Sequence, residues 1–125
     1  MPLMHLGRNN LAALATGAGI PYDSTGAILQ VSSATSTTFT ATSTDVGGTP
    51  IATTMENTYP LLSTNQMTFR GVASTAQANF AWECWGVTNA TATGAGDLLN
   101  RVQESLGTKT SAQSWQFTAD ITLTT

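Results

Sequence analysis

The residues best able to do chemistry in this chain are few and lie far apart. Cys84 is the only cysteine and His5 the only histidine, alongside seven carboxylates and four cations. A nucleophilic thiol needs a neighbouring base and an orienting group, and His5 falls in a predicted N-terminal arm. We therefore expect Cys84 to be a small buried hydrophobe rather than a nucleophile.

The carboxylates form no recognisable catalytic or metal-binding spacing. One His and one Cys cannot complete a zinc tetrahedron, and the four aspartates lack the alternation of a calcium loop. Two of the three glutamates would make a glycosidase pair only if a cleft brought them together. The four aspartates are Asp23, Asp45, Asp97 and Asp120, and the three glutamates are Glu56, Glu83 and Glu104. We expect no metal, no cofactor and no enzymatic activity.

Glu83 is the carboxylate that most needs a partner, because it lies inside an aromatic segment where an unpaired charge is costly to bury. The candidate cations are Arg70, on a predicted neighbouring strand, and Arg101, just beyond. An ion pair with one of them is favoured over a ligand contact.

The segment 79–87, Asn-Phe-Ala-Trp-Glu-Cys-Trp-Gly-Val, contains two of the three tryptophans and predicts a core strand. Strict alternation would place Trp82 and Trp85 on opposite faces. The predicted core residues are Phe69, Trp82, Trp85, Trp115 and Phe117.

Period-two patterns predict further strands and turns. From Trp115 to Leu123 apolar and polar residues alternate without exception, which is typical of an antiparallel sheet with one buried face. Strands are also expected over 27–32, 67–73 and, weakly, 38–42, while 98–106 fits a strand or a short helix, with the strand favoured. Together these predict an all-β domain over 25–125, an antiparallel β-sandwich or a barrel.

Residues 1–24 predict an N-terminal segment that is either a short helix or an extended arm. Leu6, Leu11 and Leu14 would line the helix, and Gly17 and Gly19 would end it. The first ten residues lack the charged start and apolar run of a signal peptide, and no window approaches the roughly 18 apolar residues that span a bilayer. We expect neither signal-dependent export nor a membrane partner.

The composition favours packing against other proteins over binding nucleic acid. Charged residues make up 9% of the chain, threonine supplies 24 of 125 positions, and the net charge is −3. Four cations cannot provide the electrostatic term that drives most nucleic-acid binding. A hydroxyl-rich surface with few ions suits an assembly, where each buried ion must be desolvated. Ordinary drift of composition explains the same numbers equally well, because charge bears on solubility and association rather than on fold.

The C-terminal half carries a family resemblance. Its segments are Met67-Thr68-Phe69-Arg70, then 78–90 with Trp82-Glu83-Cys84-Trp85-Gly86, then Leu98-Leu99-Asn100-Arg101, then Leu106-Gly107-Thr108-Lys109-Thr110 and Trp115. This order resembles small virion structural proteins of tailed bacteriophages. The N-terminal half, with Ile28 to Val31 followed by the threonine-rich stretch and Thr44-Asp45, is similar in outline to the same group and to β domains of tail fibres. Cys84 departs from the pattern, where a polar residue is more usual before Trp-Gly.

The resemblance implies a non-enzymatic assembly role, made in the host cytoplasm and carried on the virion. The first expectation is a decoration or cement protein on the outer surface of the head, bound to the major capsid protein, with a homotrimer favoured. The N-terminal residues Leu3, Met4, Leu6 and Arg8 would then contact a neighbouring subunit. The alternatives are a tail-fibre or tail-tip component and, less favoured, a carbohydrate-binding module that stacks sugars on exposed Trp82, Trp85 or Trp115.

Overall fold

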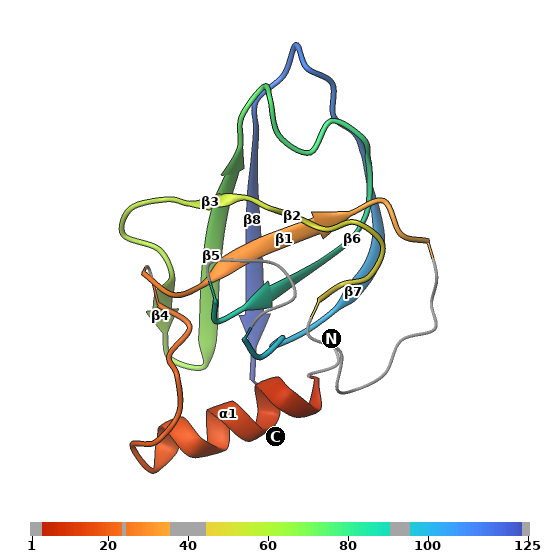
Figure 1. Cartoon of the computed structure of the whole chain (residues 1–125). Coiled ribbons are helices and arrows are strands. Elements are labelled where there is room, and N and C mark those ends of the chain that lie inside the picture. Colours follow the sequence, from red (N-terminus) through yellow and green to blue (C-terminus); the bar gives the residue numbers. More distant parts are fainter. Residues whose placement is uncertain (1–3, 24, 36–44, 91–95, 124–125) are drawn as a thin grey trace.

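The computed structural model, which describes residues 4–23, 25–35, 45–90 and 96–123, is an antiparallel β-sandwich preceded by one helix (Figure 1). The elements are α1 (His5–Ala15), β1 (Ile28–Ser32), β2 (Ile51–Ala52), β3 (Thr54–Met55), β4 (Leu61–Ser63), β5 (Gln66–Ala73), β6 (Ala81–Thr88), β7 (Val102–Thr108) and β8 (Trp115–Thr122). The predicted all-β class is confirmed.

The first sheet has the order β2-β1-β6-β7. β1 pairs along its whole length with the aromatic strand β6, with Val31 opposite Trp85. All five residues of β1 are buried, because the core covers one face and other parts of the chain cover the other. Two of the three side chains on the outer face, Gln30 and Ser32, are polar and are nevertheless buried.

The second sheet is built around β5. β8 pairs with one edge of β5 along its full length, and β3 and β4 share the other edge. Burial along β8 alternates as its sequence predicts, with Ala119 and Ile121 buried and Thr118 and Asp120 exposed. One face of this sheet therefore packs on the core and the other faces solvent.

The chain passes from the first sheet to the second at Thr53, between β2 and β3. The backbone N–H and the hydroxyl of Thr53 both donate to the carbonyl of Leu29, at 2.9 and 2.8 Å. A Cβ at Gly71 would collide with this threonine, so the crossing requires glycine on β5. In Figure 1 the strands of the two sheets cross at a steep angle, as in orthogonal packing.

The predicted strand in 98–106 is confirmed as β7, which begins later than expected, at Val102. Leu98 and Leu99 precede it and are fully buried, and Leu98 bridges Thr88. The weak strand predicted over 38–42 lies outside the described residues.

The N-terminal segment forms a helix rather than an extended arm, and this helix packs on the sandwich. The Met4 N–H donates to the carbonyl of Leu99 at 2.9 Å, and the Asn10 side chain both donates to and accepts from the backbone of Ile20. The helix ends before Gly17, whose φ of 82° favours glycine. α1 lies at the end of the sandwich opposite the β5–β6 and β7–β8 loops (Figure 1).

Candidate functional site

The aromatic residues predicted for the core pack as one cluster between the sheets. Trp82 contacts Trp115 edge to face with ring centroids 5.0 Å apart, and Phe117 contacts both Trp82, at 6.2 Å, and Trp85, at 5.3 Å. Phe69, Trp82 and Trp85 are buried, whereas Trp115 and Phe117 are partly exposed at the margin.

Trp82 and Trp85 face the same side of the sheet, which corrects the prediction of opposite faces. The pairing of β6 with β7 shifts register between Trp82 and Cys84, so the residues there do not alternate strictly. Both rings reach Phe117 as a result, and Cys84 faces away from this cluster. Because Trp82 is 1% exposed and Trp85 5%, neither presents a face on which a sugar could stack.

Cys84 lies in a second, smaller cluster with Met4, Val46 and Leu98, on the outer side of the first sheet. Its thiol is fully buried, and Sγ lies 3.6 Å from the carbonyl oxygen of Val46 and 3.8 Å from that of Ser32. Burial raises the pKa of the thiol, and the charge of Arg101 acts in the opposite direction. A buried thiol with a raised pKa is a poor nucleophile, as expected.

Glu83, Arg70 and Arg101 each have a hydrogen-bond partner among the described residues. Glu83 accepts a long hydrogen bond, 3.5 Å, from Ser105, whereas Arg70 lies on the other sheet and donates to Thr118 at 3.0 Å. Arg101 donates from Nε to the Val46 carbonyl at 2.9 Å and from Nη2 to Gln103. Glu83 is partly exposed beside the bulge, so its carboxylate reaches solvent.

Val46 joins a polar layer that the sequence analysis missed. Its N–H donates to Gln30 at 3.1 Å, its carbonyl accepts from Arg101, and the neighbouring Gly47 carbonyl accepts from Ser32 at 2.8 Å. All three side chains are at least 97% buried on the outer side of the first sheet. The segment around Val46 is thus held by hydrogen bonds to buried side chains rather than by strand pairing.

Lys109 is a second buried cation that no sequence pattern indicated. It is 1% exposed and donates from Nζ to Asn79 Oδ1 at 2.6 Å and to the Thr110 carbonyl at 3.4 Å. These bonds tie the loop before β6 to the loop after β7. The role of Lys109 is structural. Because Arg101 is buried as well, Arg8 and Arg70 are the arginines that reach solvent.

The residues predicted for an assembly arm do not form a free arm. Met4 is 2% exposed and packs inside its own chain, so it is not available to a neighbouring subunit. Arg8 is exposed on α1. Leu3 and the side chain of Leu6 lie outside the described part of the chain.

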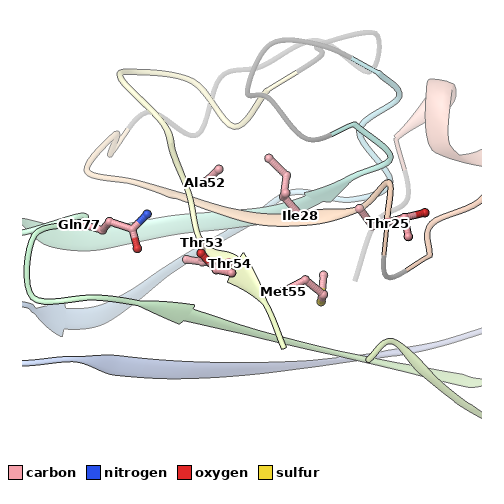
Figure 2. A pocket seen from close by; sticks show the side chains of 8 residues that line it. Thr25, Ile28, Ala52, Thr53, Thr54, Met55 and Gln77 are labelled. Carbon is pink, nitrogen blue, oxygen red and sulfur yellow. The ribbon is translucent and has the colours of Figure 1, made fainter. Parts of the chain in front are cut away.

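The surface has an open hollow of about 350 Å³ beside the crossing at Thr53 (Figure 2). Its lining is formed by Thr25, Ala27, Ile28, Ala52, Thr53, Thr54, Met55 and Gln77. Figure 2 shows Gln77 and Thr25 at its two ends with Thr53 and Thr54 between them. None of these side chains titrates near neutral pH, so the hollow offers no acid–base chemistry.

A smaller, mainly apolar hollow of about 200 Å³ lies at β4, the short strand at the edge of the second sheet. Tyr22, Pro60, Leu61, Leu62, Met67 and Phe69 line it. Leu61 is 47% exposed and Leu62 77%, and every residue of β4 is exposed. We call Leu61, Leu62 and this hollow the β4 edge patch.

Among the described residues, no three His, Cys, Asp or Glu side chains gather closely enough to hold a metal ion. In the same part of the chain no helix has the length and apolar character needed to cross a membrane. Comparison with known proteins gives no matching family model, no matching curated protein and no matching solved structure.

Proposed function

We propose that this chain is a structural virion protein of a tailed bacteriophage, and within that class a capsid decoration protein that binds and stabilises the head shell. Its partner would be the major capsid protein, and its place the outer surface of the head. The resemblance of the segments between Met67 and Trp115 to this class supports the proposal. The single structural observation that carries it is the β4 edge patch.

Monomeric proteins usually protect an exposed edge strand by keeping it short or by adding charges, proline, bulges or a covering segment. β4 is short and follows Pro60, but its own residues are apolar or uncharged. β4 carries two exposed leucines beside an apolar hollow, and its residues Leu61, Leu62 and Ser63 bear no charge. Exposed apolar groups of this kind commonly mark a protein interface. Binding a partner there would remove both leucines from water.

The contact surface proposed here differs from the predicted N-terminal arm. Met4 is already buried in its own chain, and Gly7 and Asn10 are buried where α1 meets the sandwich. Removing residues 1–10 would therefore damage the fold rather than only the attachment. We therefore place the contact with the partner at the β4 edge patch rather than at Leu3, Met4 and Leu6.

The test is co-sedimentation of the full chain with empty head shells of the phage that encodes it. The wild-type protein should saturate the shells, and Leu62→Ser should weaken binding by about tenfold, because an apolar side chain loses its burial. Ile20→Ser is the matched control, since Ile20 is 60% exposed but does not line the β4 hollow.

The alternatives predict different results in the same series. A tail component would leave the shells unbound and join purified tails instead. A carbohydrate-binding module would bind neither, and a glycan screen would quench the fluorescence of Trp115, the tryptophan that the structure leaves partly exposed. In solution, a homotrimer is expected of this class, which light scattering measures directly.

A further inference from the structure

We infer that Arg70 on the solvent face of the second sheet is a pre-oriented binding site for a carboxylate of the partner protein. This inference rests on the proposed assembly function and names the chemistry of the partner. It concerns the face formed by β5 and β8 on the side away from the core.

The register of the second sheet gathers the residues of this face. Arg70 lies opposite Thr118, and Thr68 lies opposite Asp120 on β8 and Leu61 on β4. Because cross-strand partners and residues two apart share a face, all five point to the same side. This face thus carries one exposed apolar side chain, one cation and one carboxylate, Asp120, which Thr68 engages.

Two contacts hold the guanidinium of Arg70 in place. Nε donates to the Thr118 hydroxyl at 3.0 Å, and Cζ lies 4.5 Å from the centre of the Tyr59 ring. A stacked guanidinium with one N–H fixed has lost most of its side-chain freedom before any partner arrives. Binding to it therefore requires little further ordering.

The remaining donors of Arg70 are unused within the described part of the chain. Guanidinium carries five N–H groups, and only the Nε–H of Arg70 has a partner among the described residues. Two carboxylates near Arg70 have hydrogen bonds of their own. Asp120 accepts from Thr68 at 2.7 Å, and Glu56, whose N–H donates to the Arg70 carbonyl, accepts from Gln116 at 2.7 Å. Four N–H groups in a planar fork match a carboxylate bidentately.

The charge distribution makes Arg70 the distinctive cation of the surface. Arg101 and Lys109 are 3% and 1% exposed and bond internally, and Arg8 lies on a different element, α1. Arginine and tyrosine are also the residues most often found at the energetic centre of protein interfaces. The complementary group is a carboxylate of an Asp or Glu side chain, flanked by an apolar side chain that would meet Leu61.

A first experiment needs no virion particle. The full chain, labelled with ¹⁵N, is titrated with a short peptide rich in glutamate, and the Nε–Hε signals of Arg70 and Arg8 are followed by NMR. Arg70 should shift saturably and at lower peptide concentration than Arg8, and the same peptide with glutamine for glutamate should leave Arg70 unmoved. Equal responses of the two arginines would overturn the inference.

A second experiment uses the shells. Arg70→Gln should lower affinity by about tenfold or more, whereas Arg8→Gln, which makes the same change in charge, should leave it unaltered. Arg70→Lys should recover only part of the loss, because an ammonium lacks the planar fork. Thermal unfolding of each variant confirms that the protein stays folded at the binding temperature.

The two proposals fail separately. If wild-type protein binds shells and Arg70→Gln binds as tightly, the capsid function stands and the inference about Arg70 is wrong. If wild-type protein binds no shell, the proposed function fails and the peptide titration alone decides the chemistry of Arg70. A glycan that shifts the Arg70 signal where the glutamate peptide does not would assign this face to carbohydrate and overturn the inference.

Discussion

Trp82 combines three stabilising interactions in one side chain: full burial, edge-to-face contacts with Trp115 and Phe117, and a hydrogen bond from Nε1 to the Ala78 carbonyl at 2.9 Å. Trp82→Ala should therefore lower the free energy of unfolding by about 3–5 kcal/mol. Trp115→Ala, at the margin of the same cluster, should lower it by less. Urea unfolding followed by circular dichroism measures both. Equal losses would mean that Trp115 contributes as much as the buried ring.

Cys84 makes the stability depend on pH in the alkaline range. Burial raises the pKa of its thiol in the folded protein, so the folded state keeps the proton where an unfolded cysteine, with a pKa of about 8.5, loses it. The contribution is complete below about pH 8.5 and declines as pH rises toward the folded pKa. Stability should therefore begin to fall as pH rises above about 8.5, the pKa of an unfolded cysteine.

Cys84→Ala should reduce the loss of stability that begins above about pH 8.5. It should not change a loss of stability that begins at higher pH. Tyr22 is the control, since burial first and the charge of Asp97 second raise the pKa of its phenol, which in unfolded chains is about 10. Tyr22→Phe should change the profile only above that pH. Urea midpoints measured across the range separate the two, and an unchanged slope in Cys84→Ala would exclude the thiol as the cause.

Residue identity predicted what is buried better than it predicted which way side chains point. Phe69, Trp82 and Trp85 lie in the core as their apolar area suggests. The bulge after Trp82 that turns both tryptophans to one side leaves no mark in the alternation of residue types. The burial of Arg101 and Lys109 depends on loops that cover them from elsewhere in the chain, and composition carries no such information.

At the scale of elements, α1 is held closely against the segment before β7. A Cβ on Gly7 would lie 2.5 Å from Leu99 Cα and 2.8 Å from Leu99 O, and backbone atoms cannot turn aside. Gly7→Ala should therefore destabilise the protein by about 1–3 kcal/mol, although alanine is the better helix former by about 1 kcal/mol.

Asn9→Ala is the matched control for that substitution. Asn9 is exposed on the same helix, so the change to alanine should be neutral or slightly stabilising. The two variants are compared by thermal unfolding. A stabilised Gly7→Ala would show that α1 can move away from Leu99, and would restore the predicted detachable arm.

Strands with strong period-two patterns were predictable from the sequence, and their partners were not. The alternation over 115–123 and 67–73 corresponds to β8 and β5, which lie side by side. Their pairing joins segments some fifty residues apart and is decided by the packing of both sheets, which local pattern does not contain. For the same reason the β4 edge patch could not be foreseen, because the exposure of Leu62 depends on β4 being an edge strand.

At the scale of the whole molecule, the surface combines few ions with an exposed apolar edge. Two of the four cations are buried, so the attraction between this chain and a partner cannot depend on many ion pairs. Leu62 at the β4 edge, and Leu61 with the oriented guanidinium of Arg70 on the solvent face of the sheet, would supply the contact. Such an interface responds to salt differently from a charged one.

Shell binding should therefore weaken by no more than about fivefold when sodium chloride is raised from about 0.05 to about 0.5 M, because screening acts on one ion pair. Sodium sulfate at equal ionic strength should instead strengthen binding, since excluded salts favour burial of apolar surface. Co-sedimentation in both salts gives the two slopes, and Leu62→Ser should lose the response to sulfate while Arg70→Gln keeps it. If shell affinity instead fell several hundredfold as sodium chloride was raised, many charges would have to pair across the contact. The β4 edge patch would then not be the centre of the interface.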